Sequence, residues 1–252
     1  MSVLITGAAA GLARGIAIGL ARAGYPRLAI SYRPGGTSPD ETLAALRAEG
    51  AEGAAFPIEF LGEELDVAAA LGAAVAASQP VEALVHAVGP MTIARFAKAR
   101  PEDYREMMEG NLRSAVLAAA AVLPGMRERG FGRLVFFGMN GSHATLPARG
   151  LSLHAAAKSG LVAFARSLAL EEARDGITVN VIEPGDIRDK RADGAEARRR
   201  TATNPRGRPG SWEDIAGAVR FLIAPESDFV NGAVLAVSGG LIEPYERNAP
   251  SS

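Results

Sequence analysis

The stretch Val3-Leu4-Ile5-Thr6-Gly7-Ala8-Ala9-Ala10-Gly11-Leu12-Ala13 joins a short apolar run directly to an apolar, helical segment. Gly7 allows a tight turn, and Gly11 lets the backbone approach a bound group closely. A helix that begins near Leu12 offers unpaired N–H groups and the positive end of its dipole to a phosphate. This order of strand, glycine turn and helix predicts a dinucleotide-binding turn. An ordinary βα turn in a glycine-rich chain is the alternative.

Short apolar, β-branched runs alternate with alanine-rich stretches along the rest of the chain. Candidate strands are Val3–Ile5, Arg27–Ser31, Ala54–Ile58, Ala83–Ala87, Gly132–Phe137, Thr178–Glu183 and Ala233–Val237. Candidate helices are Leu12–Ala23, Thr42–Glu49, Glu64–Ala77, Pro101–Leu123, His154–Glu172 and Trp212–Ile223. The alternation predicts an α/β fold, a single doubly wound Rossmann-type domain with a seven-stranded parallel sheet. We expect this domain to span residues 1–243, with a lid at about 186–211 and a loose tail at 244–252.

Composition excludes several classes of site and partner. The chain has 252 residues, 48% of them apolar, and a formal charge of −1, which favours neither nucleic acid nor an anionic membrane. It has no cysteine, and its three histidines lack the spacing of metal ligands, so we expect no metal site. We find no signal peptide and no apolar run long enough to span a bilayer. A cytoplasmic enzyme is the expectation.

The second candidate strand ends in Ser31-Tyr32-Arg33, and no acidic residue follows until Asp40. A carboxylate at this place grips the ribose 2′-hydroxyl of NAD, whereas an arginine suits the 2′-phosphate of NADP. Arg33 therefore favours NADP(H), with NAD still possible. A solvated surface arginine is the alternative.

Further motifs follow the opening turn in a fixed order. They are His86-Ala87-Val88-Gly89, Asn111, His154 with Lys158 four residues later, and Asn180–Gly185. Together with Thr6–Ala13 they resemble the TGxxxGxG, NNAG, helix-asparagine, YxxxK and Pro-Gly motifs of the short-chain dehydrogenase/reductase family, in its 3-oxoacyl-ACP reductase-like branch. The similarity in order and spacing runs from residue 3 to about 242.

The resemblance implies two sets of site residues. The implied catalytic residues are His154, Lys158, Asn111 and Ser142. The implied cofactor-binding residues are Thr6, Gly7, Gly11, Leu12, Arg33, Ala87, Gly89, Lys158, Pro184, Gly185 and Ile187. The family's nicotinamide cofactor, a small carbonyl or alcohol substrate, and a homodimer or homotetramer formed through Pro101–Leu123 and His154–Glu172 are implied with them.

Two of the family's usual catalytic residues are replaced. His154 stands where the family has tyrosine, and Met139 stands where it has serine when counted along the strand Gly132–Phe137. Ser142, twelve residues before His154, could supply the hydroxyl instead. Ala13 replaces the third glycine of the opening motif.

His154 and Lys158 share one helical face, so both can reach a bound ribose and nicotinamide. A positive charge lowers the pKa of an imidazole below its usual 6.5, and we therefore expect a neutral His154 at pH 7. Neutral imidazole can accept a proton from an alcohol or donate a hydrogen bond to a carbonyl. A histidine that serves only packing or ligand contact is the alternative.

The other histidines and the lid are weaker candidates. His86 is expected to cap the fourth strand near adenine, and His143 to lie in the loop after the fifth strand, where substrate could pass; each is more often structural. The lid contains the arginines Arg188, Arg191, Arg198, Arg199, Arg200, Arg206 and Arg208. They could attract a carboxylate or phosphate, or form a solvated, charged lid.

The sequence therefore predicts an NADP(H)-dependent oxidoreductase that interconverts a carbonyl and a secondary alcohol, with His154 in proton transfer. Lys158 would orient the ribose, and Asn111 would hold a relay water. Two alternatives stay open, because both Met139 and His154 depart from the family pattern. One is a catalytically degenerate nucleotide-binding protein, and the other is a non-redox enzyme that uses the same pocket.

Overall fold

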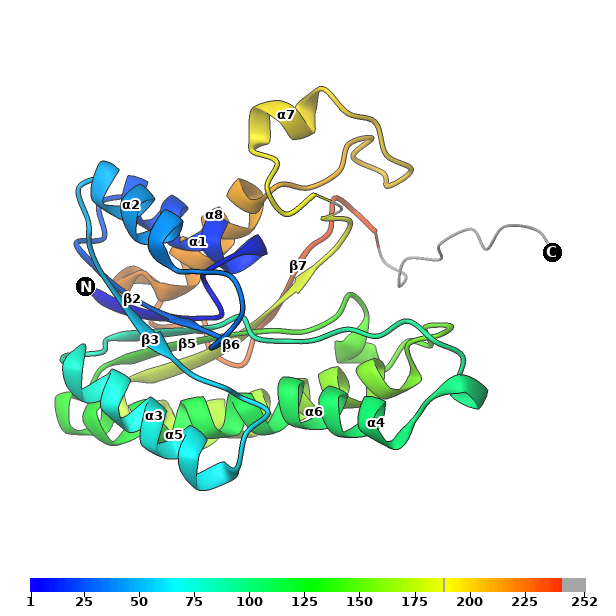
Figure 1. Ribbon diagram of the computed structural model, residues 1–252. Coiled ribbons are helices and arrows are strands. Elements are labelled where there is room, and N and C mark those ends of the chain that lie inside the picture. Colours follow the sequence, from blue (N-terminus) through cyan, green and yellow to red (C-terminus); the bar gives the residue numbers. More distant parts are fainter. Residues whose placement is uncertain (188, 242–252) are drawn as a thin grey trace.

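Seven parallel strands lie side by side in the computed structural model of the protein, which describes residues 1–187 and 189–241 (Figure 1). The strand order within these residues is β3-β2-β1-β4-β5-β6-β7. The strands are β1 (Ser2–Thr6), β2 (Arg27–Tyr32), β3 (Glu52–Pro57), β4 (Ala83–His86), β5 (Gly132–Phe137), β6 (Ile177–Pro184) and β7 (Val234–Val237). The order reverses between β1 and β4, and this is where doubly wound sheets bind ligands. The predicted fold class is confirmed.

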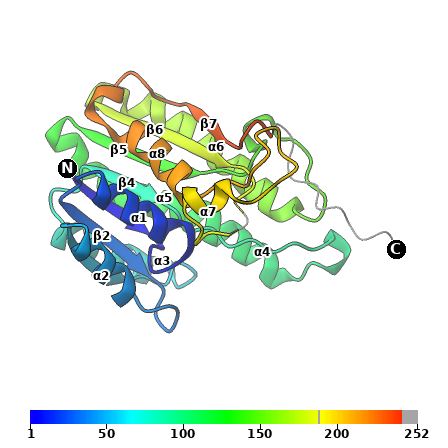
Figure 2. The ribbon, with the colours of Figure 1, turned by 90° about the horizontal axis from the view of Figure 1, so that it is seen from above.

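Helices cover both faces of the sheet, as the two views show (Figures 1 and 2). On one face lie α1 (Gly11–Arg22), α2 (Asp40–Ala48) and α8 (Trp212–Ile223), and on the other α3 (Glu64–Ala77), α5 (Ser114–Arg129) and α6 (Ser152–Glu172). Neighbouring residues of one strand point into different layers: Leu4 packs with α3 and α5, whereas Val3 and Ile5 pack with α1. Both layers bury apolar side chains, which explains why the central strands are continuous apolar runs.

Helices α1 and α8 approach each other closely through two glycines. A Cβ on Gly15 would clash with the Trp212 side chain, and a Cβ on Gly19 would lie 2.6 Å from the Cβ of Ala216. The close contact fixes the start of α1, and with it the glycine turn that precedes this helix.

The helix predicted at Pro101–Leu123 is wrong as a single element. The structure has α4 (Pro101–Met108), a π-helical turn at Glu109–Arg113, and then α5. The side-chain Nδ2 of Asn111 donates to the Met107 carbonyl oxygen (2.9 Å), a bond that competes with the regular helical register. α5 continues to Arg129 and ends at Gly130, whose φ of 63° is left-handed. The interruption places Asn111 at the ligand edge of the sheet.

The segment from Asp186 to Ser211 connects β6 to α8 and lies over the carboxyl ends of the strands (Figures 1 and 2). Excluding residue 188, it contains the short helix α7 (Gly194–Arg198), which the sequence analysis did not predict. The predicted tail at 244–252, like Arg188, lies outside the described residues, and the boundary at residue 243 stays a prediction. In the described part of the chain, no helix is long and apolar enough to cross a bilayer.

Candidate active site

The glycine turn between β1 and α1 has the conformation that the sequence predicts. Gly7 and Gly11 have φ of 71° and 63°, where side chains with a Cβ are strained. The Gly7 N–H donates to Ser31 Oγ (3.0 Å), which ties the turn to the end of β2. α1 begins at Gly11 after Ala10, which provides no side-chain cap. The first N–H groups of α1 are therefore left for an anion.

A cavity of about 350 Å³ runs along the carboxyl ends of β1 to β4. Four of the predicted cofactor-binding residues line it, namely Gly7, Arg33, Ala87 and Gly89. The remaining predicted residues, which are Thr6, Gly11, Leu12, Lys158, Pro184, Gly185 and Ile187, are not part of its lining. Arg33 stands at the β2 end, where a 2′-phosphate would lie if the glycine turn held the pyrophosphate.

Two residues near this cavity were missed by the sequence analysis. Glu59, two residues after β3, lines the cavity and is exposed. A carboxylate directly after the buried Ile58 was the signal that could have found it. From the lid, Lys190 lies over the opening turn, with its Cδ 3.6 Å from the position of a Cβ on Gly11. No sequence pattern pointed to Lys190, because only the fold of the lid brings it there.

His86 is buried in a chain of hydrogen bonds that crosses the sheet edge. Its Nδ1 lies 3.0 Å from Thr6 Oγ1, which also accepts from the Ala87 N–H, and its Nε2 lies 3.0 Å from Ser114 Oγ. Since Ser114 Oγ donates to the Gly110 carbonyl oxygen (2.8 Å), it accepts from Nε2–H, and Thr6 donates to Nδ1. Burial, with a smaller contribution from Lys158, lowers the pKa of His86 to about 3. His86 and Thr6 therefore have structural roles, because they position β1, β4 and the π-helical turn.

Asn111 and Lys158 meet beside Gly89. Asn111 is fully buried, and its Nδ2 donates to the carbonyl oxygens of Pro90 (3.0 Å) and Met107. Among the described residues its Oδ1 has no hydrogen-bond partner. A Cβ on Gly89 would lie 2.9 Å from Asn111 Oδ1 and 3.0 Å from Lys158 Nζ. An unsatisfied acceptor and an ammonium thus face the same small space, which suits a water or a hydroxyl.

Lys158 is a buried ammonium that uses one of its three donors within the protein. Its Nζ donates to the Phe137 carbonyl oxygen at the end of β5 (2.7 Å), and 5% of the residue is exposed. Burial lowers the pKa of Lys158 to about 8. Two donors are left for a ligand.

His154, in the first turn of α6, is buried and contacts the same Pro90 carbonyl oxygen as Asn111. Its Nδ1 lies 3.2 Å from the Pro90 carbonyl oxygen, so in the neutral ring the proton is on Nδ1 and Nε2 is an acceptor. Burial first, and then Lys158, lower the pKa of His154 to about 4, although the Pro90 carbonyl partly opposes this. A neutral imidazole at pH 7 agrees with the expectation from the sequence.

Ser142, the fourth predicted catalytic residue, is buried under the loop that follows β5. Its Oγ donates to Glu183 Oε1 (2.7 Å) and accepts from the Met139 N–H (3.2 Å). Only 2% of Ser142 is exposed. Its hydroxyl could act on a substrate only by giving up Glu183, so its catalytic role stays a prediction that the geometry does not favour.

The predicted Pro184-Gly185 segment leaves β6 beside β7. The Gly185 N–H donates to the Val237 carbonyl oxygen (3.0 Å), and the Ile187 N–H donates back to the Gly185 carbonyl oxygen (2.9 Å). A Cβ on Gly185 would lie 2.5 Å from the Cα of Ser238, so only glycine fits. This close packing sets the point at which the lid starts.

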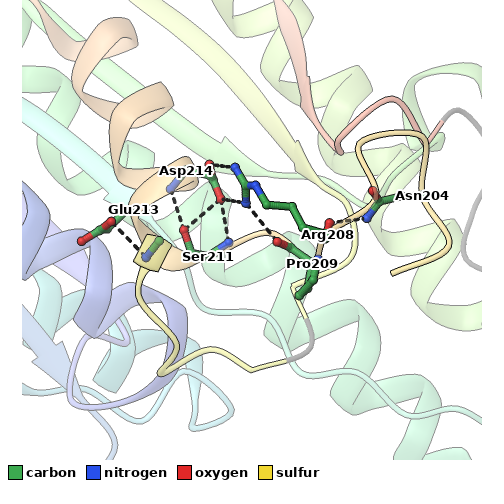
Figure 3. Close-up of polar contacts among 7 residues, drawn as sticks. Asn204, Arg208, Pro209, Ser211, Glu213 and Asp214 are labelled. Carbon is green, nitrogen blue, oxygen red and sulfur yellow. Dashed lines mark hydrogen bonds and ion pairs between the residues drawn. The ribbon is translucent and has the colours of Figure 1, made fainter. Parts of the chain in front are cut away.

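The far end of the lid is fastened to the start of α8 (Figure 3). Both Nη atoms of Arg208 donate to Asp214 (2.8 Å each), and the Arg208 carbonyl oxygen accepts from Asn204 Nδ2 (2.7 Å). The Arg208 bond, with bonds from Ser211, lowers the pKa of Asp214 to about 2. Arg200, a second lid arginine, pairs with Asp189 and Glu196. Part of the predicted positive charge of the lid is therefore neutralised by carboxylates of the protein itself.

The described residues contain no group of three His, Asp or Glu side chains arranged to hold a metal ion.

Comparisons with known proteins agree with this geometry. A family profile described as enoyl-(acyl carrier protein) reductase matches residues 7–242. The 3-oxoacyl-(acyl-carrier-protein) reductase FabG of Vibrio cholerae is 32% identical over 243 residues, which is 94% of this chain and 96% of that protein. The 2,3-dihydroxy-2,3-dihydro-p-cumate dehydrogenase of Pseudomonas putida is 32% identical over 243 residues, covering 94% of this chain and 92% of its own.

A solved structure of a variant of actinorhodin polyketide ketoreductase with NADPH is also similar. It superposes with a TM-score of 0.84 at 30% identity, over 95% of this chain and 96% of that chain. The matches in sequence and in structure extend from the glycine turn to the end of the described sheet, and the chain belongs to the short-chain dehydrogenase/reductase family of oxidoreductases.

Proposed function

We propose that this carbonyl/alcohol oxidoreductase uses NADP(H) and that His154 carries the proton of the reacting hydroxyl. The observation that carries the proposal is the meeting of Lys158 Nζ and Asn111 Oδ1 at Gly89, beside the cavity that begins at the glycine turn. The name of the ketoreductase structure with NADPH supports the choice of coenzyme.

The residues present fit such a coenzyme. The turn at Gly7 and Gly11 would hold the pyrophosphate, and Arg33 would bind a 2′-phosphate as a bidentate donor. The two free donors of Lys158 suit ribose hydroxyls, and the orphaned Asn111 Oδ1 suits a water. When bound, the nicotinamide supplies or accepts the hydride.

His154 acts best as a base in this arrangement. With Nδ1–H bonded to Pro90, Nε2 accepts the hydroxyl proton of an alcohol as its carbon loses hydride. The imidazolium then releases this proton to solvent, so that the alcohol loses one hydride to the coenzyme and one proton to water. Because its pKa is about 4, the ring is neutral at pH 7, which is the form that accepts a proton from an alcohol.

The proposal includes a homodimer or homotetramer that pairs through α5 and α6 and works in the cytoplasm on a small molecule. Light scattering after size exclusion tests the assembly: a monomer at micromolar concentration would contradict it.

The functional test starts with fluorescence titrations of NADPH and NADH. It continues with turnover on a panel of ketones, 3-oxoacyl thioesters and secondary alcohols, by wild type and by His154→Phe. We expect NADPH to bind more tightly than NADH, and His154→Phe to bind it equally well but turn over 10²- to 10⁴-fold more slowly, roughly the worth of general base catalysis. Equal inertness of both proteins would overturn the proposed activity, and tight NADPH binding without turnover would point to the degenerate binder.

A further inference from the structure

Glu183, the penultimate residue of β6, is a fully buried carboxylate with four hydrogen bonds from one loop. Its Oε2 accepts from the Gly141 N–H (2.9 Å) and lies 2.8 Å from His143 Nδ1. Its Oε1 accepts from Ser142 Oγ and from the His143 N–H (2.8 Å). Backbone N–H groups can only donate, so Glu183 serves as an acceptor throughout. The carboxylate thereby fixes the position of the loop and of the His143 ring.

The His143 ring has one fixed edge and one open edge. Since Nδ1–H of the neutral ring donates to Glu183 Oε2, Nε2 of that ring is an acceptor. The His143 side chain is 43% exposed, in contrast to the buried His86 and His154. Among the described residues, the hydrogen bond of the His143 ring is made at Nδ1.

The open edge belongs to the reaction end of the sheet. His143 follows β5, Glu183 directly precedes Pro184-Gly185, and both therefore lie at the carboxyl ends of the strands. Ser159 Oγ on α6 donates to the Ser142 carbonyl oxygen (3.1 Å). His154 is five residues earlier on this helix, roughly 8 Å along its axis. The loop that carries His143 is thus tied to the helix that carries His154.

We propose that His143, positioned by Glu183, binds a second hydroxyl of the substrate, so that the preferred substrates are diols or other polyols. The inference rests on the proposed function, in which Nε2 of His154 accepts the proton of the reacting hydroxyl. His143 Nε2 is a second acceptor, to which water donates until a substrate hydroxyl replaces it. A diol can donate to both rings, whereas a simple secondary alcohol can donate to only one of them.

The test compares matched alcohols: 2,3-butanediol against 2-butanol, and 1,2-cyclohexanediol against cyclohexanol, each with NADP⁺. His143→Asn keeps an amide donor where Nδ1 lies but has no atom at Nε2, and Arg149→Gln on the same loop is the control. We expect wild type and Arg149→Gln to prefer the diol in kcat/KM, and His143→Asn to lose about tenfold of that preference. His143→Asn should unfold at a similar temperature and bind NADPH as wild type does. A diol preference unchanged within twofold in His143→Asn overturns the inference.

Chemical labelling provides a readout without turnover. Diethyl pyrocarbonate acylates accessible imidazoles, and His143 is the exposed one of the three histidines. In protein saturated with NADP⁺, 2,3-butanediol should slow the acylation of His143 several-fold, and 2-butanol should not. Equal acylation rates with and without diol contradict the inference. If the diol protected His143 from acylation but the protein reduced no NADP⁺, the proposed activity would be contradicted and the diol site would be supported.

Glu183 acts through His143, so its test is a double-mutant cycle. Glu183→Gln should reduce the diol preference as His143→Asn does, with kcat more affected than KM. The diol preference of the double variant should equal that of His143→Asn alone, because the two substitutions remove the same contact. Additive losses would mean that Glu183 only stabilises the fold.

Discussion

The two halves of the ligand edge are built in different ways. From β1 to β4, the nucleotide half is formed mainly by backbone: two left-handed glycines, an uncapped helix start and a cavity whose lining includes Gly7, Ala87 and Gly89. From β5 to β6, the reaction half is formed by buried side chains, with Lys158, Glu183 and His154 all held by hydrogen bonds. Backbone geometry tolerates many sequences, whereas each side chain of the reaction half defines its own chemistry.

Because of this difference, substitutions in the two halves should impair different properties of the enzyme. Substitutions in the nucleotide half should change which coenzyme binds and how tightly. Those in the reaction half should change turnover, or stability as a function of pH, with coenzyme binding less affected.

The largest effect is expected from Lys158→Met, which keeps the length of the side chain and removes its charge. Turnover should fall by roughly 10³-fold, since no other cation reaches Gly89 from α6. The unfolding temperature should not fall, because burial already disfavours the charged form, with a pKa of about 8. The measurement is kcat alongside calorimetric unfolding, with the exposed Lys98→Met as control. Loss of activity through unfolding would show that Lys158 holds the structure.

Arg33→Asp tests the nucleotide half. A carboxylate at the end of β2 should repel a 2′-phosphate and accept from a 2′-hydroxyl, so the ratio of NADPH to NADH affinity should fall by about 100-fold. Arg27→Asp, at the other end of β2, is the matched control and should leave the ratio unchanged. Titration of both reduced coenzymes into each variant measures it. An unaltered ratio in Arg33→Asp would make Arg33 a solvated surface residue.

Most of the fold could be predicted because its signals are local. Seven apolar runs gave seven strands among the described residues, with ends shifted by two residues at most, and Gly132–Phe137 was predicted without error. The break in Pro101–Leu123 was missed, since Asn111 interrupts the helix through a side-chain bond that periodicity does not reveal. Helix α7 has five residues, too few for a period to show.

The site was less predictable, because its residues come together through the fold. The glycine turn follows from spacing alone, and so does the shared face of His154 and Lys158. That Ser142 faces Glu183 instead of the substrate depends on how two loops pack at the ends of β5 and β6. Lys190 reaches Gly11 through the course of the lid, which leaves no trace in nearby sequence.

A stability change of several kcal/mol is expected between pH 6.5 and 5 from the two buried histidines. The folded pKa values of His86 and His154, about 3 and 4, lie below 6.5, so the unfolded chain takes up protons first as the pH falls. The contribution of the two histidines to the free energy of unfolding is at its maximum above about pH 6.5. Below this pH it decreases by up to about 1.4 kcal/mol per pH unit for each histidine. Urea unfolding at pH 7 and 5 measures this loss. His154→Phe should reduce the loss by about half, and a flat profile would mean that these rings are charged in the folded protein.

The smallest effect tests whether the lid belongs to the nucleotide half. Lys190 lies over the N-terminus of α1, where an anion would bind, and its exposed ammonium is screened by solvent. Lys190→Gln should therefore weaken NADPH binding about threefold to tenfold at low salt, and less at 0.5 M salt, with kcat nearly unchanged. Lys98→Gln, an exposed lysine after β4, should have no effect at either ionic strength. If Lys190→Gln reduced kcat and left NADPH affinity intact, the lid would act on the reaction half instead, and the division between backbone-built and side-chain-built halves would not extend to it.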